Sequence, residues 1–340
     1  MGDKKGAVMN FMSAFHGGQI SLDPINVITY GVDTKEAGGE TVEGEIPKLI
    51  NIKQTGFIKG RSIADTFIYA LELVQVCHKR KKPALVLKLD FAKAFDTVNW
   101  DGLFSILSAR GFPDKWNQWI SSLLTSSKSA VLVNGCPGPW ITCKRGLRQG
   151  DPISPYLFFL VAETLQGMIA RCSEIKHPSE DGLPCTVLQY ADDTLIILQG
   201  NTTGVAALKN ILDDFASFSG LHINYCKSTL VPIHMTDNIT QECVQVLGCR
   251  QESFPQPYLG LALSVHKLPL SAYTPCIKKT DTYLSTWQAT LLNPMGRAVM
   301  VNSVLDSQLV YFMSSLQLPP SVIDQLDRRR RAFLWSADKT

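Results

Sequence analysis

Three aspartates lie within or next to apolar stretches, where burial of an unpaired charge would destabilise the fold. Asp90 closes an apolar run, and Asp192 and Asp193 interrupt another apolar stretch. Burying an ionised carboxylate is unfavourable unless it is paired or bound to a metal. Adjacent carboxylates also repel each other, and a divalent cation is the simplest means of stabilising them. The pattern therefore predicts a metal site; the alternative is a solvent-exposed turn that carries Asp192 and Asp193.

Carboxylates contributed by two strand ends suit two-metal phosphoryl transfer. One metal would lower the pKa of an attacking hydroxyl, and the other would orient a triphosphate and stabilise the leaving oxygen. Magnesium is the predicted cofactor, with manganese as a substitute, because hard ions take oxygen ligands. The protein would then contribute positioning and charge neutralisation rather than covalent chemistry. The predicted metal ligands are Asp90, Asp192 and Asp193.

The elements that must position these carboxylates can be read from apolar periodicity and from turn residues. Residues 84–89 predict a buried strand that ends at Asp90, and 186–198 predict a hairpin with Asp192 and Asp193 at its tip. Ser154 and Pro155 predict the N-cap and first residue of a helix that runs to about Arg171. Further helices are expected from Ser62 towards Pro83, over 100–109, over 205–218 with a stop at Gly220, and from Lys267 onward. Further strands are expected at 130–133, before the Asn134-Gly135 turn, and near 222–231.

This order of strands and helices predicts an α+β fold, an antiparallel sheet covered on one face by helices. With 340 residues, 45% of them hydrophobic, the chain can bury a sizeable core. Its nine cysteines lack zinc-ligand spacing, and its longest apolar run, 157–162, is too short for a bilayer. The N-terminus lacks the apolar region of a secretory signal, so we expect a nuclear or cytoplasmic protein that is not secreted and does not span a membrane.

Six short motifs, taken together and in order, resemble those of non-LTR (LINE-type) retrotransposon reverse transcriptases, most closely those of plant elements. The box at 190–193 (YADD) resembles the Y-x-D-D box of reverse transcriptases in general. The other motifs are 54–61 (QTGFIKGR), 91–96 (FAKAFD), 146–152 (GLRQGDP), 220–228 (GLHINYCKS) and 258–260 (YLG). The resemblance implies a right-hand polymerase with an antiparallel palm sheet and a helical thumb. Its expected activity is RNA-directed DNA polymerisation, with an RNA template, a DNA primer and dNTPs as partners.

The resemblance also implies roles for single residues. Phe95 would contact the incoming sugar and reject a 2′-hydroxyl, although an aromatic there also suits a core. Lys227 would protonate the pyrophosphate leaving group, although it also reads as a surface lysine. Arg61 and the basic run 79–82 would contact template phosphates in a salt-sensitive way. The nucleotide pocket would be formed by Phe91, Phe95, Arg148, Gln149 and Gly150.

The expected organisation has three regions. Residues 1–45 are interpreted as a partial or disrupted N-terminal and fingers remnant, because 29–45 stand where the family carries a basic fingers segment. Residues 46–260 are the expected fingers and palm core, and 261–340 a helical thumb-like region with Trp287, Trp335 and the basic run 328–331. Two alternatives stay open: a catalytically inactive nucleic-acid-binding remnant, and a metal phosphohydrolase, which the 146–152 motif disfavours. The oligomeric state is left open.

Overall fold

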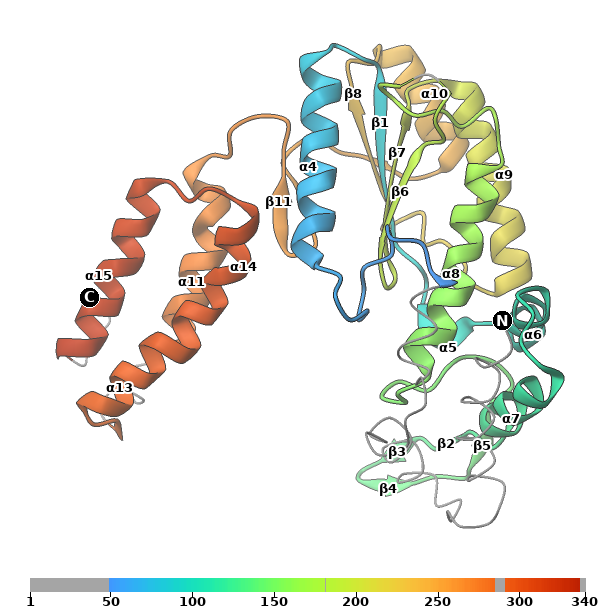
Figure 1. The fold of residues 1–340 in the computed structure, drawn as a ribbon, viewed down its shortest axis with the longest axis horizontal. Coiled ribbons are helices and arrows are strands. Elements are labelled where there is room, and N and C mark those ends of the chain that lie inside the picture. Colours follow the sequence, from blue (N-terminus) through green and yellow to red (C-terminus); the bar gives the residue numbers. More distant parts are fainter. Residues whose placement is uncertain (1–48, 181, 285–290, 337–340) are drawn as a thin grey trace. The chain divides into compact units, whose positions relative to one another are not determined.

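The computed structural model describes residues 49–180, 182–284 and 291–336. Contacts divide the chain into two compact units (Figure 1). Unit 1 comprises Met1–Arg61, as far as it is described, and Lys79–Glu252. Unit 2 comprises Ser62–His78 and Ser253–Thr340, within the same limits. The N-terminal and fingers remnant expected at 1–45 and Trp287 lie outside the described residues.

Unit 1 is built on a five-stranded sheet whose order is β6-β7-β1-β8-β9. The first four strands are antiparallel to their neighbours, as the sequence predicts, but β9 runs parallel to β8. The difference arises because the helix α10 (Asp237–Leu247) crosses over between β8 and β9, and such a crossover returns the chain in the same direction. The strands are β1 (Ala84–Leu89), β6 (Thr186–Tyr190), β7 (Asp193–Gln199), β8 (Thr229–Ile233) and β9 (Arg250–Gln251).

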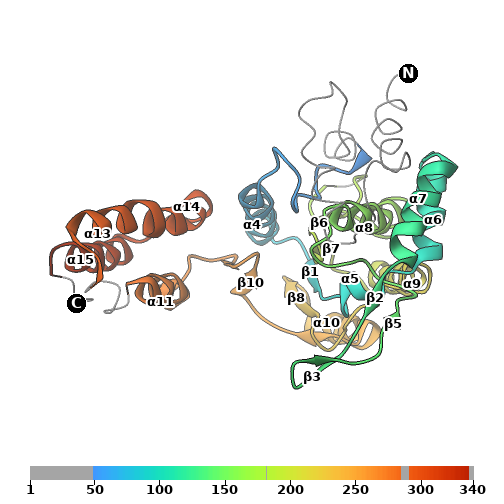
Figure 2. The same cartoon turned by 90° about the horizontal axis from the view of Figure 1, so that it is seen from below.

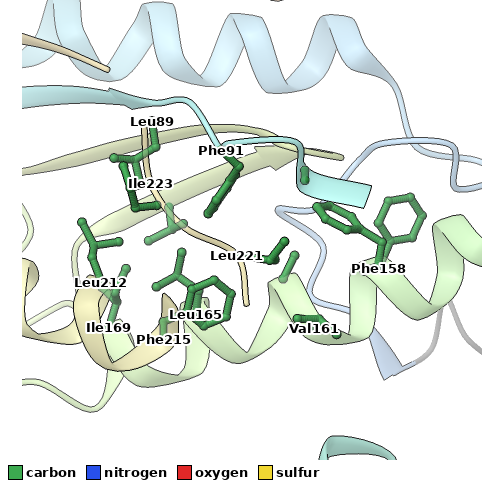
Figure 3. Packing of buried hydrophobic residues seen from close by; sticks show 14 of the residues in the cluster. Leu89, Phe91, Phe158, Val161, Leu165, Ile169, Leu212, Phe215, Leu221 and Ile223 are labelled. Carbon is green, nitrogen blue, oxygen red and sulfur yellow. The ribbon is translucent and has the colours of Figure 1, made fainter. Parts of the chain in front are cut away.

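Helices cover one face of this sheet (Figure 2). The opposite face is buried as well, at Val86, Ile197 and Val231, which differs from the predicted cover on one face only. Alternate residues of β1, Leu85, Leu87 and Leu89, pack into one core with side chains of α8 (Ser154–Ala170) and α9 (Thr202–Ser219). Figure 3 shows this packing around labelled residues of both helices. Each fully buried leucine or phenylalanine contributes roughly 1.5–3 kcal/mol, so this face holds β1 firmly in place. The short helix α5 (Ala94–Thr97) and the helices α6 (Trp100–Ala109) and α7 (Asp114–Thr125) complete the helical layer.

The start of α8 differs by one residue from the prediction. Ile153 is the N-cap, so Ser154 is the first helical residue and Pro155 the second. Asp151 closes this entry turn instead, because its carboxylate accepts a bond from the Ile153 N–H at 3.3 Å and its carbonyl accepts one from the Ser154 N–H at 3.1 Å. Ser154 is buried, and no side-chain cap is formed at the N-cap position.

Two strands are shorter than predicted. In the expected strand 130–133, only β3 (Leu132–Val133) pairs, with β4 (Cys136–Pro137), around Asn134 and Gly135, whose φ angles of 50° and 81° confirm the predicted turn. A second pairing, between β2 (Lys128–Ser129) and β5 (Ile141–Thr142), extends this hairpin. The strand expected near 222–231 begins only at Thr229, because Lys227 and Ser228 both donate N–H bonds to the Asn224 carbonyl and form a turn.

Unit 2 is mainly helical, which confirms the helical pattern predicted from Lys267 onward. Two small apolar clusters stabilise it, one around Leu309 and Val322 and one around Leu305 and Phe333. The described helix α4 begins one residue after Ser62, whose hydroxyl accepts the Ala64 N–H at 3.1 Å. The elements are α4 (Ile63–Lys79), β10 (Gln256–Tyr258), β11 (Leu261–Leu263), η1 (Leu270–Tyr273), α11 (Thr274–Tyr283), α13 (Pro294–Met300), η2 (Val301–Leu305), α14 (Asp306–Ser315) and α15 (Pro320–Ser336).

All nine cysteines lie among the described residues, and all are free thiols. Among the described helices, none has the length and apolar character needed to cross a membrane.

Candidate active site

The register of β1 and β7 brings Asp90 next to Asp193. Leu89 pairs with Thr194, so the next residues along the two antiparallel strands are Asp90 and Asp193. Cross-strand neighbours point to the same face of a sheet, and their side chains lie close together. Tyr190 pairs with Asp193 across the β6–β7 hairpin, which leaves Ala191 and Asp192 as the turn. The three predicted carboxylates therefore gather at one end of two adjacent strands.

Electrostatics support a close arrangement of these carboxylates. Burial raises the pKa of Asp193 most strongly; the Lys88 ammonium lowers this pKa, and the charges of Asp192 and Asp90 raise it further. The oxygen ligands and their mutual repulsion fit a hard divalent cation. Within the described ranges, however, no three His, Cys, Asp or Glu side chains are already drawn together tightly enough to hold a metal. The metal-ligand assignment thus stays a prediction, with a fitting set of donors.

Asp193→Asn should stabilise unit 1 near neutral pH. Because the pKa of Asp193 is raised in the folded state, that state binds more protons than the unfolded chain between the unfolded and the folded pKa. Stability is therefore lost as the pH rises through this window, and the asparagine variant avoids the loss. Thermal unfolding at several pH values should show a higher midpoint for the variant at pH 7 than for wild type, with the gain disappearing at low pH.

The matched control for this measurement is Asp214→Asn, because Asp214 is an exposed carboxylate on α9. Its unfolding midpoint should follow that of wild type across the pH range. A destabilised Asp193→Asn protein at pH 7 would contradict the electrostatic explanation.

Residues of the 54–61 motif lie against the hairpin tip. Thr55 donates its N–H to the Gln189 carbonyl at 3.0 Å, and the Gln189 N–H donates to the Lys53 carbonyl at 3.1 Å. A Cβ atom at Gly56 would lie 2.5 Å from the Ala191 nitrogen, closer than real side chains approach a backbone atom. Only glycine therefore allows this segment to lie on the turn that carries Asp192.

The 146–152 motif is joined to the segment that follows Asp90. The N–H groups of Gly146 and Leu147 donate to the carbonyls of Val98 and Phe95, at 2.8 and 2.6 Å. The Gln149 amide donates to an Asp96 carboxylate oxygen at 3.5 Å. Phe95 belongs to the segment that follows Asp90, and Gln149 is hydrogen-bonded to that segment. Both residues are predicted to line a nucleotide pocket. Gly150 has a positive φ of 88° with open space around its Cα.

Phe95 and Phe91 both take part in packing. The Phe95 ring stacks on Phe158, with ring centroids 4.8 Å apart, and is only partly buried. Phe91 is buried, bridges to Ile223 and contacts the ring of Phe215. The exposed part of Phe95 suits the predicted sugar contact, whereas the Phe91 side chain belongs to the core. Any nucleotide contact at Phe91 would involve its backbone, and both assignments stay predictions.

Lys227 lies in a turn that is bonded directly to Asp90. The Asn224 N–H donates to the Asp90 carbonyl at 2.7 Å, and the Asp90 N–H donates to the Ser228 hydroxyl at 3.1 Å. Lys227 is exposed between these two anchors. The structure therefore brings this residue to the carboxylate end of β1, as its predicted role requires, while the role itself stays a prediction.

The guanidinium groups of Arg61 and Arg148 bond to the protein itself. Arg61 donates to the carbonyls of Ile50, Asn51 and Gln54. Arg148 donates to the Leu123 carbonyl, at 3.1 Å, and to the hydroxyls of Ser126 and Ser127 at the end of α7. Through these hydrogen bonds both arginines join segments of unit 1. Their predicted contacts with template or nucleotide gain no support from this geometry and stay predictions.

Two arginines of the basic run 328–331 on α15 form ion pairs within unit 2. Arg329 pairs with Asp281 at 2.7 Å, and Arg330 pairs with Asp306 at 2.7 Å and with Asp327 at 3.2 Å. Arg328 and Arg331 are exposed, as is Trp335. Arg329 and Arg330 are therefore held in ion pairs within unit 2, and the thumb-like role of this run stays a prediction.

Sequence comparison assigns the family. The model of the family described as reverse transcriptase (RNA-dependent DNA polymerase) matches residues 40–251, more than half of the 340 residues. The chain belongs to the reverse transcriptase family. This confirms the resemblance inferred from the motifs, and the three predicted carboxylates all lie inside the matched range. The α+β class of the sheet unit is likewise confirmed.

The chain is similar to proteins of a transposon and of a retrotransposable element. It is 25% identical over 294 residues to the transposon TX1 149 kDa protein of Xenopus laevis, covering 85% of this chain and 22% of that protein. It is 25% identical over 268 residues to the Pol polyprotein of the retrotransposable element R2 of Popillia japonica, covering 74% of this chain and 36% of that protein. An uncharacterised mitochondrial protein of Arabidopsis thaliana is 54% identical over 68 residues, 18% of this chain and 56% of its own length.

The chain thus spans between about a fifth and a third of the two retrotransposon proteins. Among solved structures, telomerase from Candida albicans in complex with a fragment of telomeric RNA is similar with a TM-score of 0.48. It has 12% identity, over 86% of this chain and 46% of that chain.

Proposed function

We propose that this chain is the RNA-directed DNA polymerase core of a retrotransposon, transferring nucleotides to a primer 3′-hydroxyl by a two-metal mechanism. The observation that carries the proposal is the β1–β7 register, which sets Asp90 beside Asp193 and places Asp192 in the adjoining turn. Family membership supplies the reaction class. The alternative of a metal phosphohydrolase does not account for the link between the 146–152 motif and the segment after Asp90.

In this mechanism Asp90 and Asp192 would be the main ligands of two Mg²⁺ ions, and Asp193 would assist. When bound, the ions would supply Lewis-acid activation of the 3′-hydroxyl and neutralise charge on the triphosphate. Phe95 contacts the incoming sugar, and Gln149 and Gly150 shape the nucleotide pocket. Lys227 donates a proton to the departing pyrophosphate. The partners are an RNA template, a DNA primer and dNTPs. Residues 46–260 form the fingers and palm core, and residues 261–340 form the thumb-like region.

A second candidate is a nucleic-acid-binding protein without turnover. One observation favours it: in the part of the chain that the structure describes, the carboxylates are not already drawn together into a metal-holding cluster. The two candidates differ in chemistry but not in binding, so one experiment separates them.

The purified protein should extend a labelled DNA primer annealed to an RNA template when dNTPs and Mg²⁺ are present. Extension should stop when a chelator removes the metal and resume when Mg²⁺ or Mn²⁺ is added in excess, because the carboxylates alone cannot neutralise the reacting phosphates. Gel analysis of primer length provides the measurement. Binding of the same template and primer without extension in either metal would contradict the polymerase proposal and establish the second candidate.

A further inference from the structure

Three buried glutamines lie beside the hairpin that carries Asp192. Gln54 precedes α4, Gln166 lies on α8 and Gln189 on β6, and their exposed fractions are 0%, 6% and 0%. The Gln166 amide donates to the Gln189 side-chain oxygen at 2.8 Å, and the Gln189 amide donates to the Ala162 carbonyl at 3.4 Å. Buried amides are retained only where their donors and acceptors find partners. The hydrogen-bond partners of each glutamine therefore indicate its structural role.

Gln54 bonds the turn itself. Its side-chain oxygen accepts the Ala191 N–H at 3.0 Å and the Gly56 N–H at 3.1 Å. Its amide nitrogen donates to the Ala191 carbonyl at 3.5 Å. Both backbone polar groups of Ala191 are thus bonded by one side chain that is 137 positions away in the sequence. The orientation of the amide follows from these partners, since an N–H must meet the oxygen and a carbonyl must meet the nitrogen.

The turn needs such support because Ala191 has an unfavourable backbone conformation. Its φ is 53°, in the left-handed region that residues with a Cβ rarely adopt. A residue in this region keeps its conformation when its surroundings fix it more strongly than local sterics oppose it. Gln54 and the closely packed Gly56 provide those surroundings. The residue that follows Ala191 is Asp192, so the direction of its carboxylate depends on the Ala191 backbone.

We propose that Gln54 is a positioning residue, which holds the Ala191–Asp192 turn in the conformation that lets Asp192 share a cation with Asp90 and Asp193. This inference rests on the proposed function, because it assigns Gln54 to the same metal site. Gln54 itself contacts no ligand. It acts through the backbone of Ala191, and it needs both the acceptor and the donor of a side-chain amide.

The test is direct titration with Mn²⁺ alone, followed by electron paramagnetic resonance, for wild type, Gln54→Met, Gln166→Met and Asp192→Asn. Methionine keeps the length of glutamine but removes its hydrogen-bonding groups. Gln54→Met should weaken Mn²⁺ binding at least tenfold. Gln166→Met is the matched control, because it removes a buried amide that bonds the Gln189 side chain and not the turn. It should lower the thermal unfolding midpoint by a similar amount, yet bind Mn²⁺ as wild type does.

The outcomes separate this inference from the proposed function. If Asp192→Asn loses Mn²⁺ while Gln54→Met binds it as wild type does, the positioning role is overturned and the metal site stands. Equal weakening in Gln54→Met and Gln166→Met also overturns it, because the effect then follows general stability. If Asp192→Asn binds Mn²⁺ as wild type does, the metal site and the positioning role both fall. Should Gln54→Met fail to fold, Gln54→Asn, whose shorter amide cannot reach Ala191, is judged by the same criteria.

Discussion

Asp90→Asn is expected to lower primer extension at least roughly 10²-fold while leaving the fold intact, because electrostatic stabilisation of a reacting group carries effects of that size. Asparagine has almost the same shape as aspartate but lacks its charge, so it is a poor ligand for Mg²⁺. The bonds that hold this position use the backbone, namely the Asp90 carbonyl and N–H, and the substitution retains both. Single-turnover primer extension and thermal unfolding measure the two effects separately.

A matched control for Asp90→Asn is Glu242→Gln, which neutralises an exposed carboxylate on α10 of the same unit. It should retain wild-type extension. The unfolding midpoint of Asp90→Asn should stay equal to that of wild type or rise. Burial is the main cause of the raised pKa of Asp193, and removing the Asp90 charge relieves the smaller repulsion that adds to it. Full activity in Asp90→Asn would remove this residue from the site, whereas loss of activity together with unfolding would leave its charge without a demonstrated role in catalysis.

The carboxylate end of the sheet could be predicted because its signals are local. Apolar residues on both sides of Asp192 and Asp193 can form a buried hairpin only if the charges lie at its tip, and β6 and β7 confirm this. Asp90 follows a six-residue strand that is apolar except for Lys88, and the same reasoning applies to it. The β1–β7 register brings Asp90 next to Asp193, and this register could not be predicted from the sequence.

Long-range hydrogen bonds are the part that sequence reasoning missed. Nothing near Gln54 in the chain indicates that its amide is buried against Ala191, and the nearby Gly56, which permits the tight approach, was the one available hint. The bonds from the Arg148 guanidinium to the end of α7 are also long-range and could not be read from the sequence. The parallel β9 was missed because a short strand after a helix has no pattern that specifies its direction.

The 146–152 motif depends on a glycine for a reason that can be tested by stability alone. Gly146 has a φ of 85°, and a Cβ atom there would lie 2.6 Å from the Asp96 carbonyl oxygen and 2.8 Å from its carbon. These are backbone atoms of the segment that contains Phe95, and they cannot move aside as a flexible side chain can. The Gly146 N–H and carbonyl are also bonded, to the Val98 carbonyl and to the indole N–H of Trp100, both at 2.8 Å.

Gly146→Ala should therefore combine two costs. An alanine with positive φ costs roughly 1–2 kcal/mol, and displacing the Asp96 backbone brings the total to about 3–5 kcal/mol, the range of severe single substitutions. Gly111→Ala separates the two, because Gly111 has a similar φ of 79° but a Cβ atom added there would meet nothing within 4 Å. Chemical denaturation should show a loss at Gly146 at least twice that at Gly111. Equal losses would mean that the loop yields without strain, and that glycine is needed at position 146 only for its positive φ and not for the close approach to the Asp96 backbone.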